Sequence, residues 1–258
     1  MSKHHTNFSS KSKDGLPVQA SIFSIYKKAG ETLAELILRF RQEQSLSEDL
    51  PITYAGRLDP MADGLVLLLT GEKCKQKDSF LGLDKTYVFE VLFGISTDTF
   101  DMLGIVTESS EFIPTEEQIQ NSIEKIKNTK EFPYPPFSSK PVNGKPLFVH
   151  AKEGTLPKQM PTIKGVVDSS ILQNTRVIRV EDAVREKIEI IKKVQGDFRQ
   201  KEIIDSWNKI LEKYPNRKCL IATFEATVSS GIYIRTLANI FGGLAYSIKR
   251  VRIGDFEL

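Results

Sequence analysis

The segment from Gly56 to Gly64 constrains the chain most, because it holds Asp59 in a backbone setting that neither a regular helix nor a plain strand needs. Pro60 disfavours helical backbone angles at Asp59, and the two glycines permit tight or left-handed turns on either side. The next residues, 65–70, form an apolar run with the length of a buried strand. We therefore predict a rigid loop that presents an acid beside the core. Taken alone, this segment is explained equally well by an Asp-Pro turn whose carboxylate only accepts hydrogen bonds from nearby backbone amides.

Length and charge limit the kind of protein. A chain of 258 residues can bury a sizeable core, as one α/β domain or two small ones. The formal net charge of +3 is a weak basic bias, so any nucleic-acid surface must be local. Basic residues gather at Lys73, Lys75, Lys77 and Lys85, and again at 249–252. Taken alone, each cluster is explained by a solvated face.

The cysteines and the N-terminal residues bear on location. Cys74 and Cys219 lack the spacing of a metal site, so we interpret them as reduced structural residues with no metal. Residues 1–20 are predicted to be a disordered leader, since they contain neither the apolar core of a signal peptide nor a membrane span. We therefore expect a cytoplasmic protein.

Apolar periodicity predicts the secondary structure. Helical spacing predicts helices at 32–44, from 115 onward, twice between 180 and 214, and at 233–241. Apolar or alternating runs predict strands at 65–70, 87–93 and 219–228. The Pro-rich stretch 131–146 is predicted to be irregular. Strands and helices that mix without regular alternation indicate an α+β fold, with a largely antiparallel mixed sheet flanked by helices.

Several motifs in the same order resemble the TruB-type tRNA pseudouridine synthases. Residues 56–64 resemble the family's catalytic loop, in which the Asp is the nucleophile, and residues 85–87 its Lys-x-Tyr. Residues 97–104 match its Thr-Asp-Thr-x-Asp-x-x-Gly loop, 231–235 its Gly-x-Tyr-Ile-Arg, and 135–154 its RNA-gripping thumb. The resemblance covers about 21–258. It implies a single pseudouridine synthase catalytic domain with a divergent or inserted helical stretch at about 156–218.

The resemblance also implies an activity. The chain would isomerise a specific uridine of a structured RNA to pseudouridine, in the T-loop of tRNA, with no cofactor and no metal. We expect RNA as its partner, no membrane, and a monomer. Two alternatives remain open: a ribosomal-RNA pseudouridine synthase of a neighbouring branch, and a non-catalytic RNA-binding or RNA-folding protein.

Physical chemistry gives the catalytic candidates their roles. The reaction breaks an N–C glycosidic bond and rejoins the ribose through C5, so it needs no redox group, and a carboxylate nucleophile such as Asp59 divides it into easier steps. A carboxylate in a partly apolar site needs an opposite charge to stay ionised, and Arg235 is the candidate for a bidentate pair. Without the resemblance, a surface or phosphate-contacting role would suit this arginine better. Tyr87 is the family's base-stacking aromatic.

A base inside folded RNA must be flipped out and held between flat or apolar side chains. The predicted substrate-binding residues are aromatic, apolar or basic: Tyr233, Tyr54, Lys85, Lys145, Arg250 and Ile248. The three basic ones are candidates for phosphate contact, which positions RNA without reading sequence. Asp98 and Asp101 are predicted to cap or support their loop, because acids near RNA repel phosphate.

The chain also departs from the family pattern. Tyr54 stands five residues before Asp59, where bacterial relatives commonly have His, so any role that needs an imidazole is absent. The thumb segment is one residue short near Lys140, and His150 replaces an aromatic or aliphatic residue. We also expect the small C-terminal RNA-binding domain of many relatives to be missing after Leu258.

Overall fold

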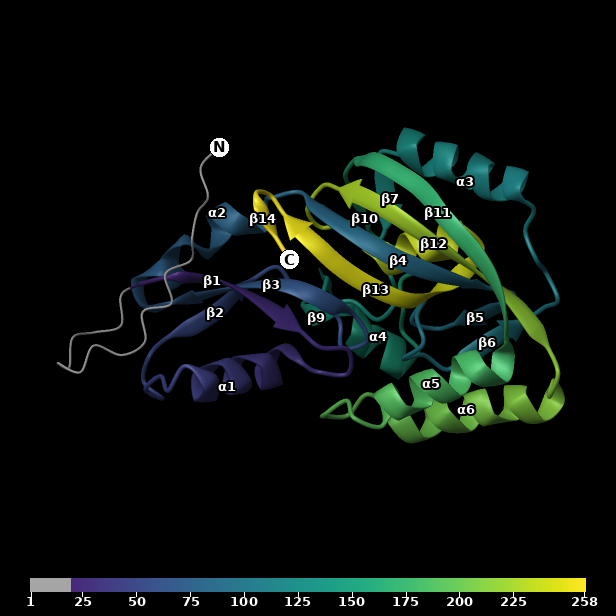
Figure 1. The fold of residues 1–258 in the computed structure, drawn as a ribbon, viewed down its shortest axis with the longest axis horizontal. Coiled ribbons are helices and arrows are strands. Elements are labelled where there is room, and N and C mark those ends of the chain that lie inside the picture. The colour runs from purple at the N-terminus through teal and green to yellow at the C-terminus, as the bar shows by residue number, and fades with distance from the viewer. Residues whose placement is uncertain (1–19) are drawn as a thin grey trace.

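The computed structural model describes residues 20–258, so the expected leader falls, except for Ala20, outside the described residues. Within this range the main sheet has eight strands in the order β1-β3-β13-β4-β12-β11, with β2 paired to β3 and β14 to β13 (Figure 1). Neighbouring strands are antiparallel, except that β13 runs parallel to β3 over a short stretch. The predicted α+β fold with a largely antiparallel mixed sheet is confirmed. The strands are β1 (Ile22–Lys27), β2 (Ile52–Ala55), β3 (Asp63–Thr70), β4 (Lys85–Phe93), β11 (Val167–Arg179), β12 (Lys218–Val228), β13 (Gly243–Ile253) and β14 (Phe256–Glu257).

Helices and short hairpins complete the fold. The helices are α1 (Leu33–Glu43), the 3-10 helix η1 (Gly71–Gln76), α2 (Lys77–Leu81), α3 (Glu116–Asn128), α4 (Leu147–Glu153), α5 (Val180–Ile191), α6 (Gln200–Lys213) and α7 (Ile234–Ile240). The short strand pairs are β5 (Ile95–Thr97) with β6 (Val106–Ser109), β7 (Glu131–Pro133) with β10 (Thr162–Lys164), and β8 (Pro141–Val142) with β9 (Lys145–Pro146).

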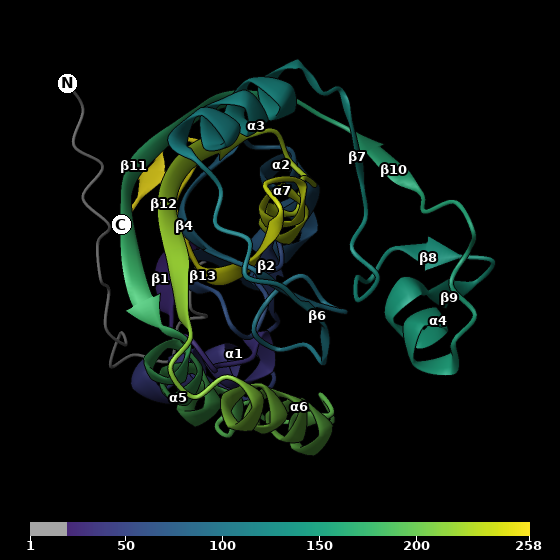
Figure 2. The same cartoon turned by 90° about the vertical axis from the view of Figure 1, so that its right-hand side faces the viewer.

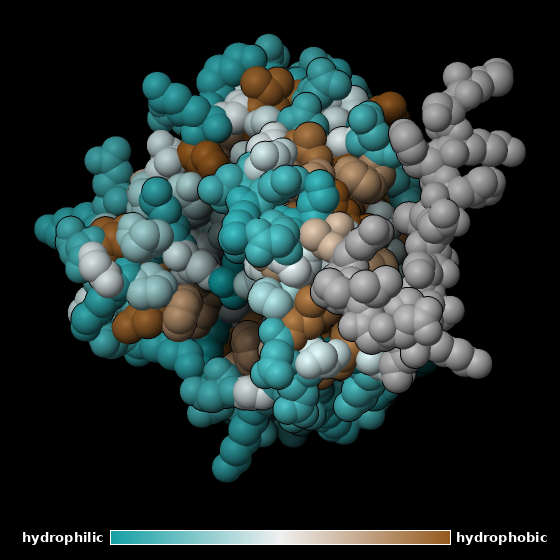
Figure 3. All heavy atoms as spheres, turned by 90° about the vertical axis from the view of Figure 1, so that its left-hand side faces the viewer, coloured by the Kyte–Doolittle hydropathy of each residue, from teal (hydrophilic) through white to brown (hydrophobic). Residues whose placement is uncertain are grey.

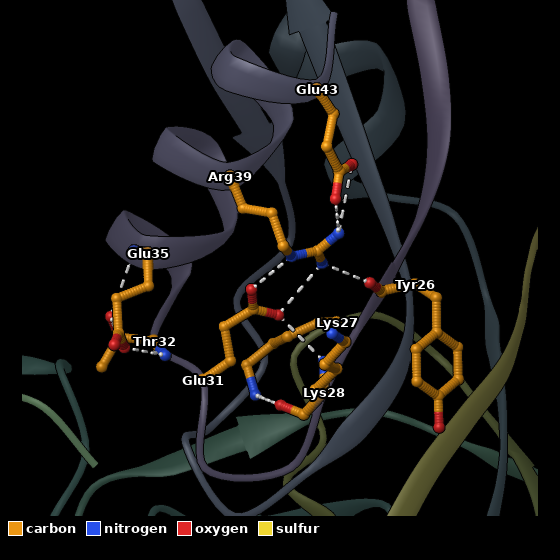
Figure 4. Close-up of polar contacts among 8 residues, drawn as sticks. All are labelled: Tyr26, Lys27, Lys28, Glu31, Thr32, Glu35, Arg39 and Glu43. Carbon is orange, nitrogen blue, oxygen red and sulfur yellow. Dashed lines mark hydrogen bonds and ion pairs between the residues drawn. The ribbon is translucent and has the colours of Figure 1, made fainter. Parts of the chain in front are cut away.

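Local sequence explains why α1 begins where it does. The side chain of Thr32 accepts the backbone N–H of Glu35, whose carboxylate accepts the backbone N–H of Thr32, and the two contacts form a capping box. Arg39 then ties the helix to β1: its Nε donates to Glu31 at 2.7 Å and its Nη2 donates to the carbonyl of Tyr26 at 2.8 Å (Figure 4). The predicted helix at 32–44 is confirmed.

Two apolar clusters cover opposite faces of the sheet. In Figure 2 the sheet curves around α7, and α3 closes that concave side. The cluster there contains Phe89 and Phe224 of the sheet and Ile123 of α3. On the other face α5 and α6 pack through Trp207 and Val184. Since strand side chains alternate between faces, β4 contributes to both clusters.

Two expectations about secondary structure are wrong. The stretch 156–218 is not only helical, because it contains β10 and the thirteen-residue edge strand β11. The Pro-rich stretch 131–146 contains the short strands β7, β8 and β9. Long-range strand pairing overrides local composition in each case.

The surface of the described chain is mixed in character. On the face shown in Figure 3, hydrophobic residues are scattered among hydrophilic ones. Within residues 20–258 no helix is long and apolar enough to cross a membrane.

Candidate active site

Asp59 lies in the loop between β2 and β3, and its side chain is 35 % exposed. The loop leads into β3, whose second residue, Gly64, has a φ of +111°. A Cβ at this position would lie 2.3 Å from the carbonyl oxygen of Arg250 on the neighbouring strand, so only glycine fits. The close approach of β3 to β13 therefore fixes the end of the loop that presents Asp59.

Arg235, in the first turn of α7, is the cation beside Asp59. Its side chain is 4 % exposed, and its Nε donates to Asp59 Oδ2 at 2.8 Å. The predicted ion pair is confirmed, but the predicted two-bond geometry is wrong. The remaining guanidinium nitrogens donate to backbone carbonyls instead, Nη1 to Thr99 at 2.7 Å and Nη2 to Phe137 at 3.2 Å. Three chain segments thus orient one guanidinium.

A second carboxylate, Asp101, faces the same guanidinium. Its Oδ2 lies 3.6 Å from Nε of Arg235, while its Oδ1 accepts the hydroxyl of Thr99 at 2.7 Å and the N–H of Leu103 at 2.9 Å. Burial raises the pKa of Asp101 to about 6, although Arg235 acts in the opposite direction. The guanidinium therefore faces two acids, of which Asp101 is buried and Asp59 is partly open to solvent.

The loop 97–104 is tightly folded around these contacts. Asp98 Oδ1 accepts the N–H of Ile105 at 2.9 Å, so the predicted loop-supporting roles of Asp98 and Asp101 are confirmed. A Cβ on Gly104 would lie 2.2 Å from Oγ1 of Thr99. Glycine at this position is required for the loop to close on itself.

Arg250 supports the Asp59 loop from β13 and corrects a prediction. Its side chain is fully buried, and its guanidinium donates to the carbonyls of Leu65 at 2.7 Å, Arg57 at 3.0 Å and Gly56 at 3.3 Å. The predicted phosphate contact is wrong, because this cation is inaccessible and its donors are used by backbone.

Lys27 is a second buried support, which the sequence analysis missed. Its ammonium donates to the carbonyls of Ala62 at 2.6 Å, Pro60 at 3.2 Å and Lys28 at 3.0 Å, and Figure 4 shows the last of these contacts. Burial lowers the pKa of Lys27 to about 8. Lys27 follows a mainly apolar run that ends at Tyr26 and is itself followed by Lys28, so nothing in the local pattern distinguishes it from a surface residue at the end of a strand.

Lys85 is also buried rather than available to RNA. Its ammonium donates to the carbonyls of Leu81 at 3.1 Å and Leu83, and to the hydroxyl of Ser230 at 3.3 Å. Burial lowers the pKa of Lys85 to about 8. The predicted phosphate contact of Lys85 is therefore wrong in this structure.

Aromatic residues surround the ion pair. The guanidinium carbon of Arg235 lies 5.6 Å from the ring centroid of Tyr233, whose ring meets that of Tyr134 edge-on at 5.8 Å. Burial raises the pKa of Tyr233. Tyr87 and Ile248 are each 7 % exposed and belong to the apolar cluster on the concave face. Their roles toward a base stay predictions.

Two predicted contacts lie farther out. The ring of Tyr54 packs against the same cluster, and Nζ of Lys77 lies 5.2 Å from its centroid. Lys145 is exposed and pairs with Glu153 at 3.1 Å, in the thumb segment that projects beside the sheet with β8, β9 and α4 (Figure 2).

Within residues 20–258, no group of three or more His, Cys, Asp or Glu side chains could hold a metal ion.

The fold and this site agree with the comparison to protein families. Residues 46–181, just over half of the chain, match the family described as TruB family pseudouridylate synthase (N terminal domain), and the chain belongs to this family. A tRNA pseudouridine synthase B of Rickettsia akari is 33 % identical over 241 residues, which cover 91 % of this chain and 67 % of that protein.

Other relatives match over shorter or more distant stretches. A tRNA pseudouridine synthase B of Caldicellulosiruptor saccharolyticus is 35 % identical over 118 residues, 46 % of this chain and 41 % of that protein. A tRNA pseudouridine synthase 4 of Schizosaccharomyces pombe is 26 % identical over 279 residues, 85 % of this chain and 69 % of that protein. The match to the protein of Caldicellulosiruptor saccharolyticus covers less than half of that protein's length.

Solved structures support the fold. A chain in the crystal structure of a Cbf5-Nop10-Gar1 complex superposes with a TM-score of 0.51 at 14 % identity, over 92 % of this chain and 49 % of that chain. A chain in the structure of an H/ACA RNP bound to a substrate RNA containing 2'-deoxyuridine gives a TM-score of 0.50 at 14 % identity, over 92 % and 48 %. These likenesses concern the architecture alone.

Proposed function

We propose that this protein is a tRNA pseudouridine synthase that isomerises a uridine in the T-loop. The observation that carries the proposal is the half-exposed carboxylate of Asp59, held at 2.8 Å by a buried guanidinium on a loop braced by Arg250 and Lys27. Such an acid is preorganised to attack an electrophilic carbon. Family membership supports the same activity.

The reaction is balanced without a cofactor. The bond from N1 of uracil to C1′ of the ribose breaks, a bond from C5 to C1′ forms, a proton leaves C5, and N1 gains one. Asp59 would add to the ribose or to the base and leave again, so the carboxylate is regenerated. Arg235 would keep Asp59 oriented and charged throughout, because its other donors are fixed on the carbonyls of Thr99 and Phe137.

The target base would leave the RNA stack and enter beside Asp59. Tyr87 and Tyr233 would hold it by stacking, since every base has a face that packs on an aromatic ring. Because Lys85 and Arg250 are buried, phosphate contact would come from exposed cations such as Lys145 and Arg57.

The decisive test is conversion of a tRNA transcript by the purified chain and by Asp59→Asn. The amide keeps the shape of the side chain and removes the nucleophile, so the variant should bind tRNA and form no pseudouridine, measured by chemical mapping at single-nucleotide resolution. Asp255→Asn, an exposed position between β13 and β14, serves as the matched control and should remain active. Turnover by Asp59→Asn would contradict the assignment of the nucleophile.

The same assay separates the alternatives. A ribosomal-RNA fragment offered in parallel would be modified in place of tRNA if the protein belongs to that branch. A non-catalytic RNA-binding protein would bind both RNAs and leave every uridine unchanged. The proposed isomerisation consumes no metal or cofactor, so we expect activity to persist in EDTA.

A further inference from the structure

The turn between α5 and α6 places an arginine against the active-site loop. Arg199, the residue before α6, has a φ of +61°, which a non-glycine residue adopts only when its surroundings hold it there. Its Nη1 donates to Asp98 Oδ2 at 2.7 Å and its Nη2 to Asp98 Oδ1 at 3.3 Å. Its guanidinium carbon also lies 4.0 Å from the ring centroid of Phe137. The flat guanidinium therefore binds one partner at its edge and the other through its face.

Both partners of Arg199 belong to segments that hold Arg235. The carbonyl of Phe137 accepts Nη2 of Arg235, and the carbonyl of Thr99, the residue after Asp98, accepts Nη1. Arg199 thus holds the side chain of Phe137 and that of Asp98, the residue before Thr99. Arg199 therefore bridges the same two segments that Arg235 bridges through the carbonyls of Thr99 and Phe137.

The rest of α6 reinforces one side of this arrangement. Nε1 of the buried Trp207 donates to the carbonyl of Met102 at 3.2 Å, and the hydroxyl of Ser206 accepts the N–H of Val106 at 3.2 Å. These contacts lie along and just after the loop 97–104. Within residues 20–258 no hydrogen bond joins the segment 135–138 to α6, and Arg199 contacts this segment through the ring of Phe137.

We propose that Arg199 is a positioning residue of the active site, acting on Asp59 through Arg235. The α5–α6 helix pair, which the sequence suggested to be a divergent addition, is then part of the machinery that orients the nucleophile. This inference rests on the proposed isomerase activity. A small displacement of either carbonyl would turn the guanidinium of Arg235 away from Asp59, and orientation errors of this kind lower rates strongly.

A purely structural ion pair predicts a different outcome. The side chains of Arg199 and Asp98 are 19 % and 24 % exposed, so the pair is only partly shielded from water. If it contributed to stability alone, its loss would lower the unfolding midpoint and leave the rate of the folded enzyme unchanged. If it positions Arg235, the single-turnover rate falls while tRNA affinity holds.

The experiment measures single-turnover rate at saturating tRNA, tRNA affinity and thermal unfolding for Arg199→Ala and Arg199→Lys. We expect Arg199→Ala to lose at least roughly tenfold in rate, with affinity within about twofold of the wild type. Arg199→Lys keeps the charge but loses the flat face over Phe137, so its rate should be intermediate. Arg185→Ala removes an exposed ion pair with Glu181 on α5 and is the matched control.

A double-mutant cycle tests the route of the effect. Asp98→Asn keeps an oxygen for the N–H of Ile105 but removes the charge that Arg199 binds. The double variant should be no slower than Arg199→Ala, because both changes break one linkage. Fully multiplicative losses would overturn a route through Asp98.

Hydrogen exchange of the amides in 98–106 gives a readout that needs no activity. Arg199→Ala should lose protection at Ile105 relative to Arg185→Ala, even if the wild type proves unable to isomerise uridine. An inactive wild type would contradict the proposed function. Hydrogen exchange would still report whether Arg199 holds the loop 97–104 in place. If Arg199→Ala fails to fold, Arg199→Lys decides. Rates within twofold of the wild type for every folded Arg199 variant would overturn the proposal.

Discussion

Two buried arginines hold the Asp59 loop in different places, and they differ in what their guanidinium groups bind. Arg250, on β13, donates only to backbone carbonyls of the loop and of β3. Arg235, on α7, divides its donors between the carboxylate of Asp59 and two carbonyls from remote segments. The first arginine fixes where the loop runs, and the second fixes how its acid points. Burial of a cation therefore does not by itself mark it as catalytic or as structural.

Replacement of Arg250 should have the largest effect, and on folding. Arg250→Ala removes a fully buried side chain and leaves three carbonyls without their donor, so the free energy of unfolding should fall by about 4 kcal/mol. Urea unfolding followed by circular dichroism measures this. Lys249→Ala, an exposed neighbour on the same strand, should cost under about 1 kcal/mol. A stable Arg250→Ala variant would show that the loop does not depend on this cation.

Replacement of Arg235 by lysine should act on chemistry. Lysine cannot reach the carboxylate and both carbonyls with the same planar group, so the single-turnover rate should fall by roughly two orders of magnitude. Affinity for tRNA should change far less, which rapid-quench kinetics and filter binding can separate. Arg179→Lys, at an exposed ion pair with Asp182, provides the control. Near-normal chemistry with weakened binding would instead make Arg235 a phosphate contact.

The acid that shares Arg235 should give the site a pH-dependent stability. The pKa of Asp101 is raised to about 6, so its protonated form is favoured in the folded state; its contribution to folding is present below about pH 4 and is lost as pH rises through 6. Relative to Asp101→Asn, the wild type should lose about 2 kcal/mol of unfolding free energy between pH 4 and 7. Parallel pH profiles for the two proteins would show that Asp101 ionises normally.

Added salt should lower the affinity for tRNA but barely change the single-turnover rate, so its effect on the rate is the smallest one predicted. Phosphate neutralisation by exposed cations makes tRNA affinity fall steeply with salt. The contacts of Arg235 and Arg250 are buried and weakly screened, so the single-turnover rate at saturating tRNA should vary by less than about twofold. Titrations at several salt concentrations decide this. A flat affinity would mean that specific contacts, rather than charge, hold the tRNA.

The contrast also explains which site residues could be found from the sequence. Asp59 and Arg235 lie in motifs that resemble those of the TruB-type synthases, and this resemblance identified them. Local sequence alone fits an Asp-Pro turn equally well and a surface arginine better. The capping boxes at Thr32 and Thr115 are local as well, and the helices that follow them begin within one residue of the predicted starts. The phosphate contacts predicted for Lys85 and Arg250 are wrong. A basic residue near motifs of an RNA-modifying family suggests a phosphate contact until the surroundings of its side chain are known.

The sequence by itself determined the α+β class, the loop that presents Asp59, the cation that faces it and the α5–α6 helix pair. Only the tertiary structure decided that β13 enters the sheet between β3 and β4, that Lys27 and Arg250 hold the loop, and that Arg199 reaches Asp98 across the fold. The physical reason is the range of the interaction. Turns and caps are satisfied within a few residues, whereas a buried cation depends on carbonyls and carboxylates that distant segments bring to it.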